Sequence, residues 1–244
     1  VTLQERVNGK MLPEVEIIDM NQESKRSSYH ITNTLLKNLN DCIKRGDQAI
    51  LFLNRRGFST FVTCKNCSEV IKCPNCDITL TYHKSNKMLR CHYCGYATPL
   101  PKECPKCHEN SLSDLGVGTE KIEEELHTLL PSIKVLRMDV DTTSKKGAHK
   151  KMIDAFRNHE YDILLGTQIV AKGLDFSDVT LVGVINADTS LNIPDFRSSE
   201  NTYSLLSQVA GRSGRSSKTG KVLIQTFNPD HYAISFVKHH DYLG

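Results

Sequence analysis

The residues with the clearest chemistry in this chain are eight of its nine cysteines, which form four C-x-x-C pairs. The pairs are Cys64 with Cys67, Cys73 with Cys76, Cys91 with Cys94, and Cys104 with Cys107. Zinc takes four ligands at tetrahedral corners, and one C-x-x-C turn presents two thiolates on a tight bend. Two bends complete a site, so the spacing predicts two structural zinc ions. Disulfides or redox-active pairs are disfavoured, because redox motifs rarely occur four in a row and the N-terminal residues contain no apolar signal core.

Three pairings of these turns are possible, namely sequential, interleaved and nested, and the segment between the two inner pairs favours the nested one. Residues 77–90 begin with an alternating pattern that puts Ile78, Leu80 and Tyr82 on one side, and the chain then turns at 83–86. This pattern predicts a hairpin. A hairpin of that length returns the second inner turn beside the first, as in a zinc ribbon. We therefore expect one ion on Cys73, Cys76, Cys91 and Cys94, and the other on Cys64, Cys67, Cys104 and Cys107.

Other side chains in and near this segment have simpler interpretations. Cys42 stands alone in a helical pattern and is expected to be a buried small apolar residue. His83, His92 and His108 could replace a thiolate, but eight cysteines already fill two sites, so we expect them to be bystanders. Residues 62–110 contain seven Lys/Arg and four Asp/Glu, yet each tetrathiolate zinc site has a formal charge of about −2 that these basic residues first offset. Direct DNA contact by this segment is therefore not the main hypothesis.

The cysteine segment interrupts an alternation of strands and helices in a chain of ordinary globular composition. Apolar runs predict strands at Glu14–Met20, Ala49–Leu53, Ile133–Met138, Tyr161–Thr167, Val179–Asp188 and Lys221–Phe227. Helical periodicity predicts helices at 30–45, Gly118–Leu130, Lys146–Asn158 and Ser198–Gly211. Strands that alternate with helices of this length predict an α/β fold, with a parallel sheet covered by helices on both faces.

The same pattern predicts how the chain is divided. Residues 1–48 would lead into the α/β domain, 49–61 would continue it, 62–110 would be the zinc-binding insertion, and 111–244 would complete the domain. The net charge of +3 is too small to identify a partner, and no run of apolar residues approaches the length of a membrane span.

Polar residues follow several predicted strands and the last long helix. They are residues 54–57, 139–143, 166–168, Asp188, Asp195, Arg197 and 208–215. Taken singly, Asp139 or Thr143 could cap a helix and Arg215 could be a solvated charge. Taken together on the carboxyl edge of a parallel sheet, where active sites of such folds lie, they predict a phosphate-handling surface.

Three stretches around these residues resemble motifs of superfamily 2 helicases. QVAGRSGR at Gln208–Arg215 resembles motif VI, GTQIVAKGLDF at Gly166–Phe176 motif V, and AILFLNRRGFS at Ala49–Ser59 motif IV. With eight cysteines between motifs IV and V, and with NADTSLNIPDFRSSE at Asn186–Glu200, the chain is similar to the PriA family of replication-restart helicases. The resemblance extends from about Ala49 to Phe227, and the first forty residues match only loosely.

This resemblance implies a fold, an activity and partners. The fold is the second RecA-like lobe of a two-lobed motor, with the zinc module inserted. The activity of the full protein, a monomer at bacterial replication forks in the cytoplasm, is ATP-dependent 3′→5′ unwinding of branched DNA. Implied partners are forked and single-stranded DNA, the first helicase lobe, primosome proteins and single-strand-binding protein. Implied cofactors are two structural Zn²⁺, with ATP and Mg²⁺ in the full protein.

The resemblance also implies roles for single residues. Arg212 and Arg215 match motif VI arginines that reach the γ-phosphate across the lobe interface, where an arginine finger stabilises transition-state charge. The residues implied at the ATP site are Gln208, Gly173 and Asp175. The residues implied at the DNA backbone are Arg56, Thr167, Gln168 and Lys172.

Two helicase motifs do not occur in the chain. The phosphate-binding loop G-x-x-x-x-G-K-[ST] and the acidic D-E-x-H magnesium motif are both absent, and both belong to the first lobe. We therefore expect a piece of a longer protein, and we expect that the chain alone does not hydrolyse ATP.

Two other functions are open. The zinc module could be a platform for protein partners, with Tyr93, Tyr96 and Leu100 as its apolar part, or these residues could simply pack the module. A stand-alone zinc-ribbon protein that binds nucleic acid is the third possibility, but such a protein would have no use for the arginine spacing of QVAGRSGR.

Overall fold

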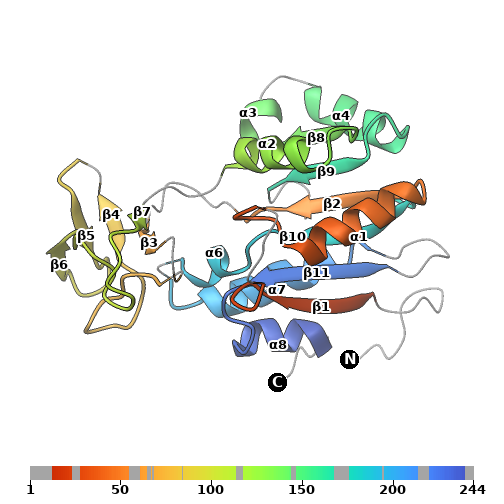
Figure 1. Ribbon diagram of the computed structural model, residues 1–244. Coiled ribbons are helices and arrows are strands. Elements are labelled where there is room, and N and C mark those ends of the chain that lie inside the picture. Colours follow the sequence, from red (N-terminus) through yellow and green to blue (C-terminus); the bar gives the residue numbers. More distant parts are fainter. Residues whose placement is uncertain are drawn as a thin grey trace. The chain divides into compact units, whose positions relative to one another are not determined.

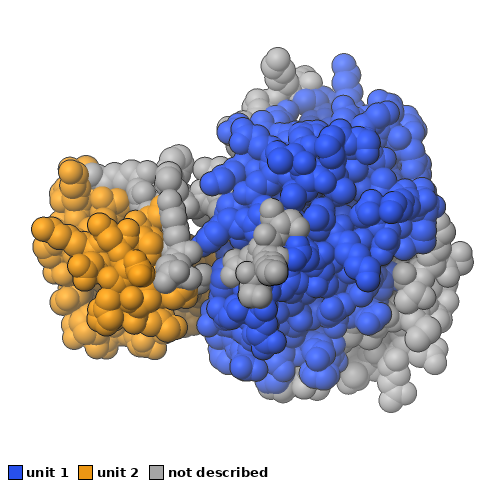
Figure 2. Space-filling view, in the orientation of Figure 1, with its two compact units in different colours: residues 1–54, 118–187, 202–244 blue, residues 55–117, 188–201 orange. Residues whose placement is uncertain are grey.

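The computed structural model describes residues 13–23, 28–54, 61–64, 67, 69–83, 85–113, 118–143, 147–167, 176–193, 195–213 and 220–239. The chain divides into two compact units, shown in Figure 2. The sheet unit comprises residues 1–54, 118–187 and 202–244, and the cysteine unit comprises residues 55–117 and 188–201. Within the described ranges, no helix is both long and apolar enough to cross a membrane.

The sheet unit is built on six strands, all parallel (Figure 1). In chain order they are β1 (Glu14–Asp19), β2 (Gln48–Phe52), β8 (Val135–Met138), β9 (Ile163–Gly166), β10 (Val179–Val184) and β11 (Lys221–Thr226). Their order across the sheet is β1-β11-β10-β2-β9-β8, and every neighbouring pair is parallel. The predicted parallel sheet is confirmed, although most strands are slightly shorter than expected.

Helices cover both faces of this sheet. They are α1 (Asn33–Lys44), α2 (Thr119–Leu129), α3 (Val140–Thr143), α4 (Ala148–Arg157), α7 (Ser198–Ala210) and α8 (Tyr232–His239). Strands β2, β9 and β10 are buried at every residue, so side chains that point to either face are shielded from water. The sequence predicted α1, α2, α4 and α7, whereas α3 and α8 were not expected.

Helix α1 lies close against β2 and β10 because a glycine leaves room for it. Leu35, Leu39 and Cys42 recur at helical spacing and form the buried face of α1, so the prediction of a buried Cys42 is confirmed. A Cβ atom at Gly183 in β10 would lie 2.6 Å from Leu51 Cδ2 and 2.9 Å from Leu35 Cδ1. The missing side chain therefore sets how near the helix can approach the sheet.

The amide of Gln225 ties β11 to β10 and to the start of α1. Its Oε1 accepts hydrogen bonds from Thr32 N at 2.9 Å and from Thr32 Oγ1 at 2.7 Å. Its Nε2 donates to His30 O at 2.8 Å and to Ile185 O at 2.7 Å. Thr32 is the N-cap of α1, and its Oγ1 accepts from Leu35 N. All four bonding positions of a fully buried amide are thus satisfied.

We expect the substitution Gln225→Leu to lower the free energy of unfolding by about 3 kcal/mol, because several buried polar groups would lose their partner at once. Urea unfolding of the zinc-loaded chain, followed by circular dichroism, measures the loss. Gln22→Leu is the control, since Gln22 is exposed and should change stability by less than about 0.5 kcal/mol. A loss below about 1 kcal/mol for Gln225→Leu would contradict this role.

The cysteine unit consists of short strands around a small core. Its strands are β3 (Thr63–Cys64), β4 (Thr81–His83), β5 (Met88–Arg90), β6 (Ala97–Pro99) and β7 (Leu112–Ser113), and its helix is α6 (Asp188–Leu191). Strands β4, β5 and β6 form one antiparallel sheet, and β3 pairs with β7. The β4–β5 hairpin confirms the predicted reversal between the inner cysteine pairs. Among the described residues, the main buried cluster of this unit comprises just Val62, Leu80, Leu89, Cys73 and Cys91, so bound metal is expected to supply much of the stability.

Candidate metal centres and the edges of the sheet

All four C-x-x-C turns are folded by the same backbone hydrogen bonds. The N–H of the first cysteine in each turn donates to the carbonyl five residues later, at 2.7–2.9 Å. These pairs are Cys64 with Glu69, Cys73 with Ile78, Cys91 with Tyr96, and Cys104 with Glu109. Such tight bends bring the two thiols of one turn to the same side, which is the arrangement a tetrahedral metal needs.

In three of the turns, the residue after the second cysteine has a left-handed backbone. Asp77 has φ 53°, Gly95 φ 77° and His108 φ 60°, and each donates its N–H to the carbonyl of the first cysteine. Glycine adopts this conformation freely, whereas a side chain there is strained, although Asp and His tolerate it better than most residues. The same left-handed corner thus recurs in each of the three turns whose following residue the structure describes.

The structure brings the eight cysteines together in two groups. One group, the outer site, contains Cys64, Cys67, Cys104 and Cys107, and the other, the inner site, contains Cys73, Cys76, Cys91 and Cys94. Within each group all sulfur atoms lie within 4.8 Å of one another. Two sulfur pairs of the outer site and one of the inner site are 3.6 Å apart. Four thiolates about 2.3 Å from a tetrahedral zinc would be about 3.8 Å apart, so both groups fit this ion. This grouping corresponds to the nested arrangement.

In each site, one cysteine sulfur has a polar side chain within hydrogen-bonding distance. Ser111 Oγ lies 2.9 Å from Cys64 Sγ in the outer site, and Asn75 Nδ2 donates to Cys94 Sγ at 3.6 Å in the inner site. Hydrogen bonds from the N–H of Tyr96 and from the Asn75 amide lower the pKa of Cys94 to about 6. In contrast, the hydrogen bond between Cys76 and Cys94, and then burial, raise the pKa of Cys76 to about 12. The four thiols of the metal-free inner site therefore cannot all ionise at neutral pH, and a divalent cation would displace the remaining protons.

We expect zinc to leave the inner site first. Cys94 is the exposed ligand of that site, whereas every ligand of the outer site is buried or half-buried. A chelator titration followed by native mass spectrometry should show a one-zinc intermediate, and alkylation of that intermediate should label inner-site cysteines. Asn75→Ala should speed the first release about tenfold, because it removes a hydrogen bond to a ligand sulfur. Preferential labelling of Cys64, Cys67, Cys104 or Cys107 would contradict this order.

The histidines and lysines of the cysteine unit take no direct part in either group. His83, His92 and His108 lie in the described part of the chain and belong to neither group, and the rings of His83 and His92 pack edge to face at 5.4 Å. Two of the basic residues are used within the unit, since Lys106 Nζ is 3.0 Å from a Glu69 carboxylate oxygen and Lys72 Nζ is 3.3 Å from one of Asp77. The pKa of Lys106 is raised, first by that hydrogen bond to Glu69.

Asp139, at the carboxyl end of β8, has a structural role. Its Oδ1 accepts from Thr142 N at 2.9 Å, which caps α3, and its Oδ2 accepts from Thr119 Oγ1 at 2.8 Å. Burial opposes ionisation of this carboxyl group, but these hydrogen bonds and nearby Arg137 outweigh it, so its pKa lies below the usual range. The helix-cap interpretation of Asp139 is confirmed, and its oxygens are occupied by protein donors.

The other polar residues do not share one edge of the sheet. Asn54 and Thr167 follow β2 and β9 at the carboxyl edge, and both are buried. Ser213, just after α7, donates from Oγ to Thr180 O at 3.1 Å and lies 3.3 Å from Lys221 O, and both acceptors are at the amino ends of their strands. The prediction that the end of α7 lies at the carboxyl edge was therefore wrong. A helix that links two parallel strands leaves the carboxyl edge and must return to the amino edge.

Several residues of interest lie outside the described part of the chain. Among the implied ATP- and DNA-binding residues these are Arg56, Gln168, Lys172, Gly173, Asp175 and Arg215. Gln208 is exposed on α7, where its Nε2 donates to Ser204 Oγ at 3.4 Å, and Arg212 is half-buried in the turn that follows α7. The end of α7 thus presents both residues at the amino edge.

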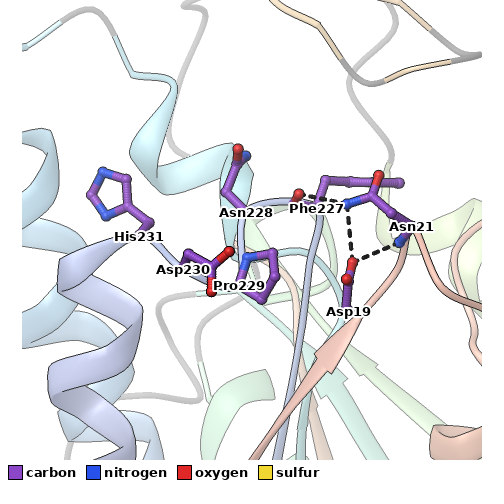
Figure 3. Close-up of a pocket in the computed structure, with 7 residues that line it drawn as sticks. All are labelled: Asp19, Asn21, Phe227, Asn228, Pro229, Asp230 and His231. Atoms are coloured by element: carbon purple, nitrogen blue, oxygen red, sulfur yellow. Dashed lines mark hydrogen bonds between the residues drawn. The ribbon is translucent and has the colours of Figure 1, made fainter.

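A polar hollow at the carboxyl edge was not foreseen (Figure 3). It has a volume of about 340 Å³ and is lined by Asp19, Asn21, Phe227, Asn228, Pro229, Asp230 and His231. Asn21 donates to Asp19 Oδ1 at 3.0 Å and to Phe227 O at 2.7 Å, and His231 Nδ1 accepts from Ala233 N at the start of α8. Asp19 and His231 lie at opposite ends of the hollow, so the titratable groups do not converge on one point. These contacts indicate a structural role in joining β1, β11 and α8.

Comparison with known proteins finds two families that match parts of the chain. Residues 73–99 match the family described as "PriA DNA helicase Cys-rich region (CRR) domain", and residues 114–217 match the "Helicase conserved C-terminal domain". The "Replication restart protein PriA" of Bacillus subtilis (strain 168) is 52% identical over 99% of this chain, and that of Synechocystis sp. is 45% identical over 99%. A solved structure of RecG bound to a three-way DNA junction superposes with a TM-score of 0.48 at 12% identity, over 96% of this chain and 22% of that one.

The chain spans only part of these relatives. It covers 30% of the length of the Bacillus subtilis and Synechocystis proteins. The matched part contains both the cysteine unit and the parallel sheet.

Proposed function

We propose that this chain is the second lobe of an ATP-dependent DNA helicase of the PriA kind, because it aligns over nearly its whole length with part of PriA proteins and matches both a PriA Cys-rich region and a helicase C-terminal domain. The longer protein would unwind branched DNA in the 3′→5′ direction and start the reassembly of replication machinery at stalled forks. Its partners would be forked and single-stranded DNA, primosome proteins and single-strand-binding protein. One observation carries this proposal: a helicase-type parallel sheet and two Cys₄ groups occur together in one chain that matches its relatives over nearly its whole length.

In this proposal the two edges of the sheet have different tasks. Thr167, at the carboxyl edge, would contact the DNA backbone, and Gln168, Lys172 and Arg56 are proposed to share this role. Arg212, in the turn after α7 at the amino edge, would approach the γ-phosphate of ATP together with Arg215, and Gln208 near the end of α7 would face the nucleotide. Gly173 and Asp175 are proposed to contribute to the same ATP site. ATP and Mg²⁺ would be held chiefly by the first lobe, and the charge supplied by the two arginines would stabilise the phosphoryl-transfer transition state. Among the described residues, Thr167 follows the carboxyl end of β9, whereas Arg212 follows α7 at the amino edge, and this supports a division of labour between DNA contact and ATP sensing.

The cysteine unit would be a zinc-stabilised accessory to this lobe. Two zinc ions on the inner and outer sites would hold a segment whose apolar core is too small to fold alone. The alternative of a platform for protein partners relied on Tyr93, Tyr96 and Leu100 as its apolar surface. Tyr96 and Leu100 pack against the core of the unit, so they do not support that alternative. Of those three, only Tyr93 is exposed.

Nucleotide hydrolysis tests this assignment. The zinc-loaded 244-residue chain is expected to hydrolyse ATP no faster than background, because phosphate loop and magnesium motif are absent from it. The longer protein is expected to hydrolyse ATP and to be stimulated by single-stranded DNA. DNA-stimulated hydrolysis by the isolated chain, or a longer protein that is inert with and without DNA, would refute the proposal.

A further inference from the structure

Two strongly exposed aromatic side chains lie together on the cysteine unit. Phe196 is 70% exposed and Tyr93 is 53% exposed, although large apolar side chains are costly to leave in water. They are 103 residues apart in the chain, yet their ring centroids are 6.5 Å apart with the rings at 90°. Phe196 N donates to Tyr93 Oη at 3.4 Å, so the tyrosine hydroxyl is held by the backbone while about half of the residue stays exposed.

An arginine adds positive charge to this pair. The Arg197 guanidinium lies over the Phe196 ring, 5.1 Å from its centroid. No carboxylate of the described part of the chain forms an ion pair with this guanidinium, because the nearby Asp195 Oδ1 accepts from the backbone N–H of Arg197 instead. An exposed guanidinium stacked on an exposed ring has its fork of donors available for a phosphate or another anion.

We propose that Tyr93, Phe196 and Arg197 form a binding site for single-stranded nucleic acid, in which bases stack on the two rings and Arg197 contacts the backbone. Each nucleotide offers one flat π-face and one phosphate, which are the two features that this cluster can bind. Stacking accepts any base, so such a site suits a motor that must move along unrelated sequences. The inference rests on the proposed function, and it assigns to the cysteine unit a direct contact with the single strand.

A single strand accounts for the cluster better than a peptide does. An apolar peptide would cover the rings but would leave the arginine charge without a partner, at a cost in desolvation. A nucleotide covers the rings and neutralises the charge at once. The overall charge of the unit is not the driving force, since zinc thiolates offset its lysines, so stacking and one local phosphate contact would supply the binding.

The proposal is tested by measuring how tightly the longer protein binds a short oligothymidylate. Fluorescence anisotropy at several salt concentrations gives this affinity. Phe196→Ala and Tyr93→Ala should each weaken binding about tenfold, without changing the slope of affinity against salt. Arg197→Ala should weaken binding and lower that slope by about one ion, whereas Arg197→Lys should keep the slope. Tyr93→Phe should bind nearly as the wild type does, because it keeps the ring.

Matched controls separate a local effect from misfolding. Tyr232→Ala removes an equally exposed aromatic side chain, 57% exposed, from the sheet unit and should leave the affinity unchanged. All variants should retain two zinc ions, which shows that the cysteine unit is folded. Losses that occur only together with zinc loss would mean that the rings are merely structural, and would overturn the inference.

Two further outcomes would also overturn the inference. In the first, the Phe196→Ala and Tyr93→Ala variants bind oligothymidylate within twofold of the wild type, and the ATPase of the protein is stimulated by DNA. This result would reject the site but not the proposed function. If these variants instead lose binding to single-strand-binding protein while DNA affinity stays normal, the cluster serves a protein partner. A wild-type protein with no DNA-stimulated ATPase, in contrast, would reject the proposed function itself.

Discussion

If the longer protein is the proposed helicase, replacing Arg215 with alanine is expected to lower its DNA-stimulated ATPase about a thousandfold, the usual effect of losing an arginine finger. Arg212→Ala should also lower the ATPase rate, because Arg212 lies in the turn that follows α7, at the amino edge of the sheet. Lysine at either position should rescue little, since an ammonium cannot reproduce the planar fork that contacts two phosphate oxygens. Steady-state phosphate release under saturating DNA measures the change.

The matched control for this experiment is Arg157→Ala. Arg157 is the last residue of α4, a helix that also returns to the amino edge of the sheet, and its side chain is 53% exposed. We expect its removal to leave ATPase within twofold of the wild type. Zinc content and oligothymidylate binding should be normal in all these variants. If Arg215→Ala retains ATPase within tenfold of the wild type, the finger assignment is wrong.

The second large effect concerns the metal. Cys73→Ser is expected to reduce the bound zinc from two ions to one, and Cys104→Ser should do the same, because the two sites use separate sets of ligands. Structural zinc sites contribute on the order of 10 kcal/mol to folding, so loss of one ligand should also expose the small core of the cysteine unit to proteolysis. Zinc content is measured by elemental analysis, and native mass spectrometry gives the distribution of zero, one and two ions.

Cys42→Ser is the matched control for a change from thiol to hydroxyl. Cys42 is fully buried in α1 and belongs to neither metal group, so this variant should keep two zinc ions while losing some stability of the sheet unit. A fall from two ions to none in Cys73→Ser would show that the sites fold only together. Retention of two ions would show that Cys73 is not a ligand.

Much of the sheet unit follows from local patterns in the sequence. The continuous apolar runs of β2, β9 and β10 predict strands buried on both faces, and the spacing of Leu35, Leu39 and Cys42 predicts the buried face of α1. The reversal between the inner cysteine pairs was also predictable, because the hairpin of β4 and β5 is local.

Other features could not be predicted because they depend on distant contacts or on chain direction. Strands β3 and β7 have two residues each and exist only because residues 63 and 113 meet. The packing of residues 188–201 with the rest of the cysteine unit depends on contacts such as that between Tyr93 and Phe196. The placement of Ser213 at the amino edge required the direction of α7 to be considered, not only the polarity of the residues after it.

The order of strands across the sheet determines what can fold while the chain is being synthesised. Strand β1 pairs only with β11, and β2 pairs only with β9 and β10, so no strand of the main sheet has a partner until β9 has left the ribosome. All four C-x-x-C turns emerge before that point. Residues 61–113 are therefore the first part of the nascent chain in which strands can pair, and zinc supply at the ribosome would decide whether the main sheet is later assembled around a folded or an unfolded insertion.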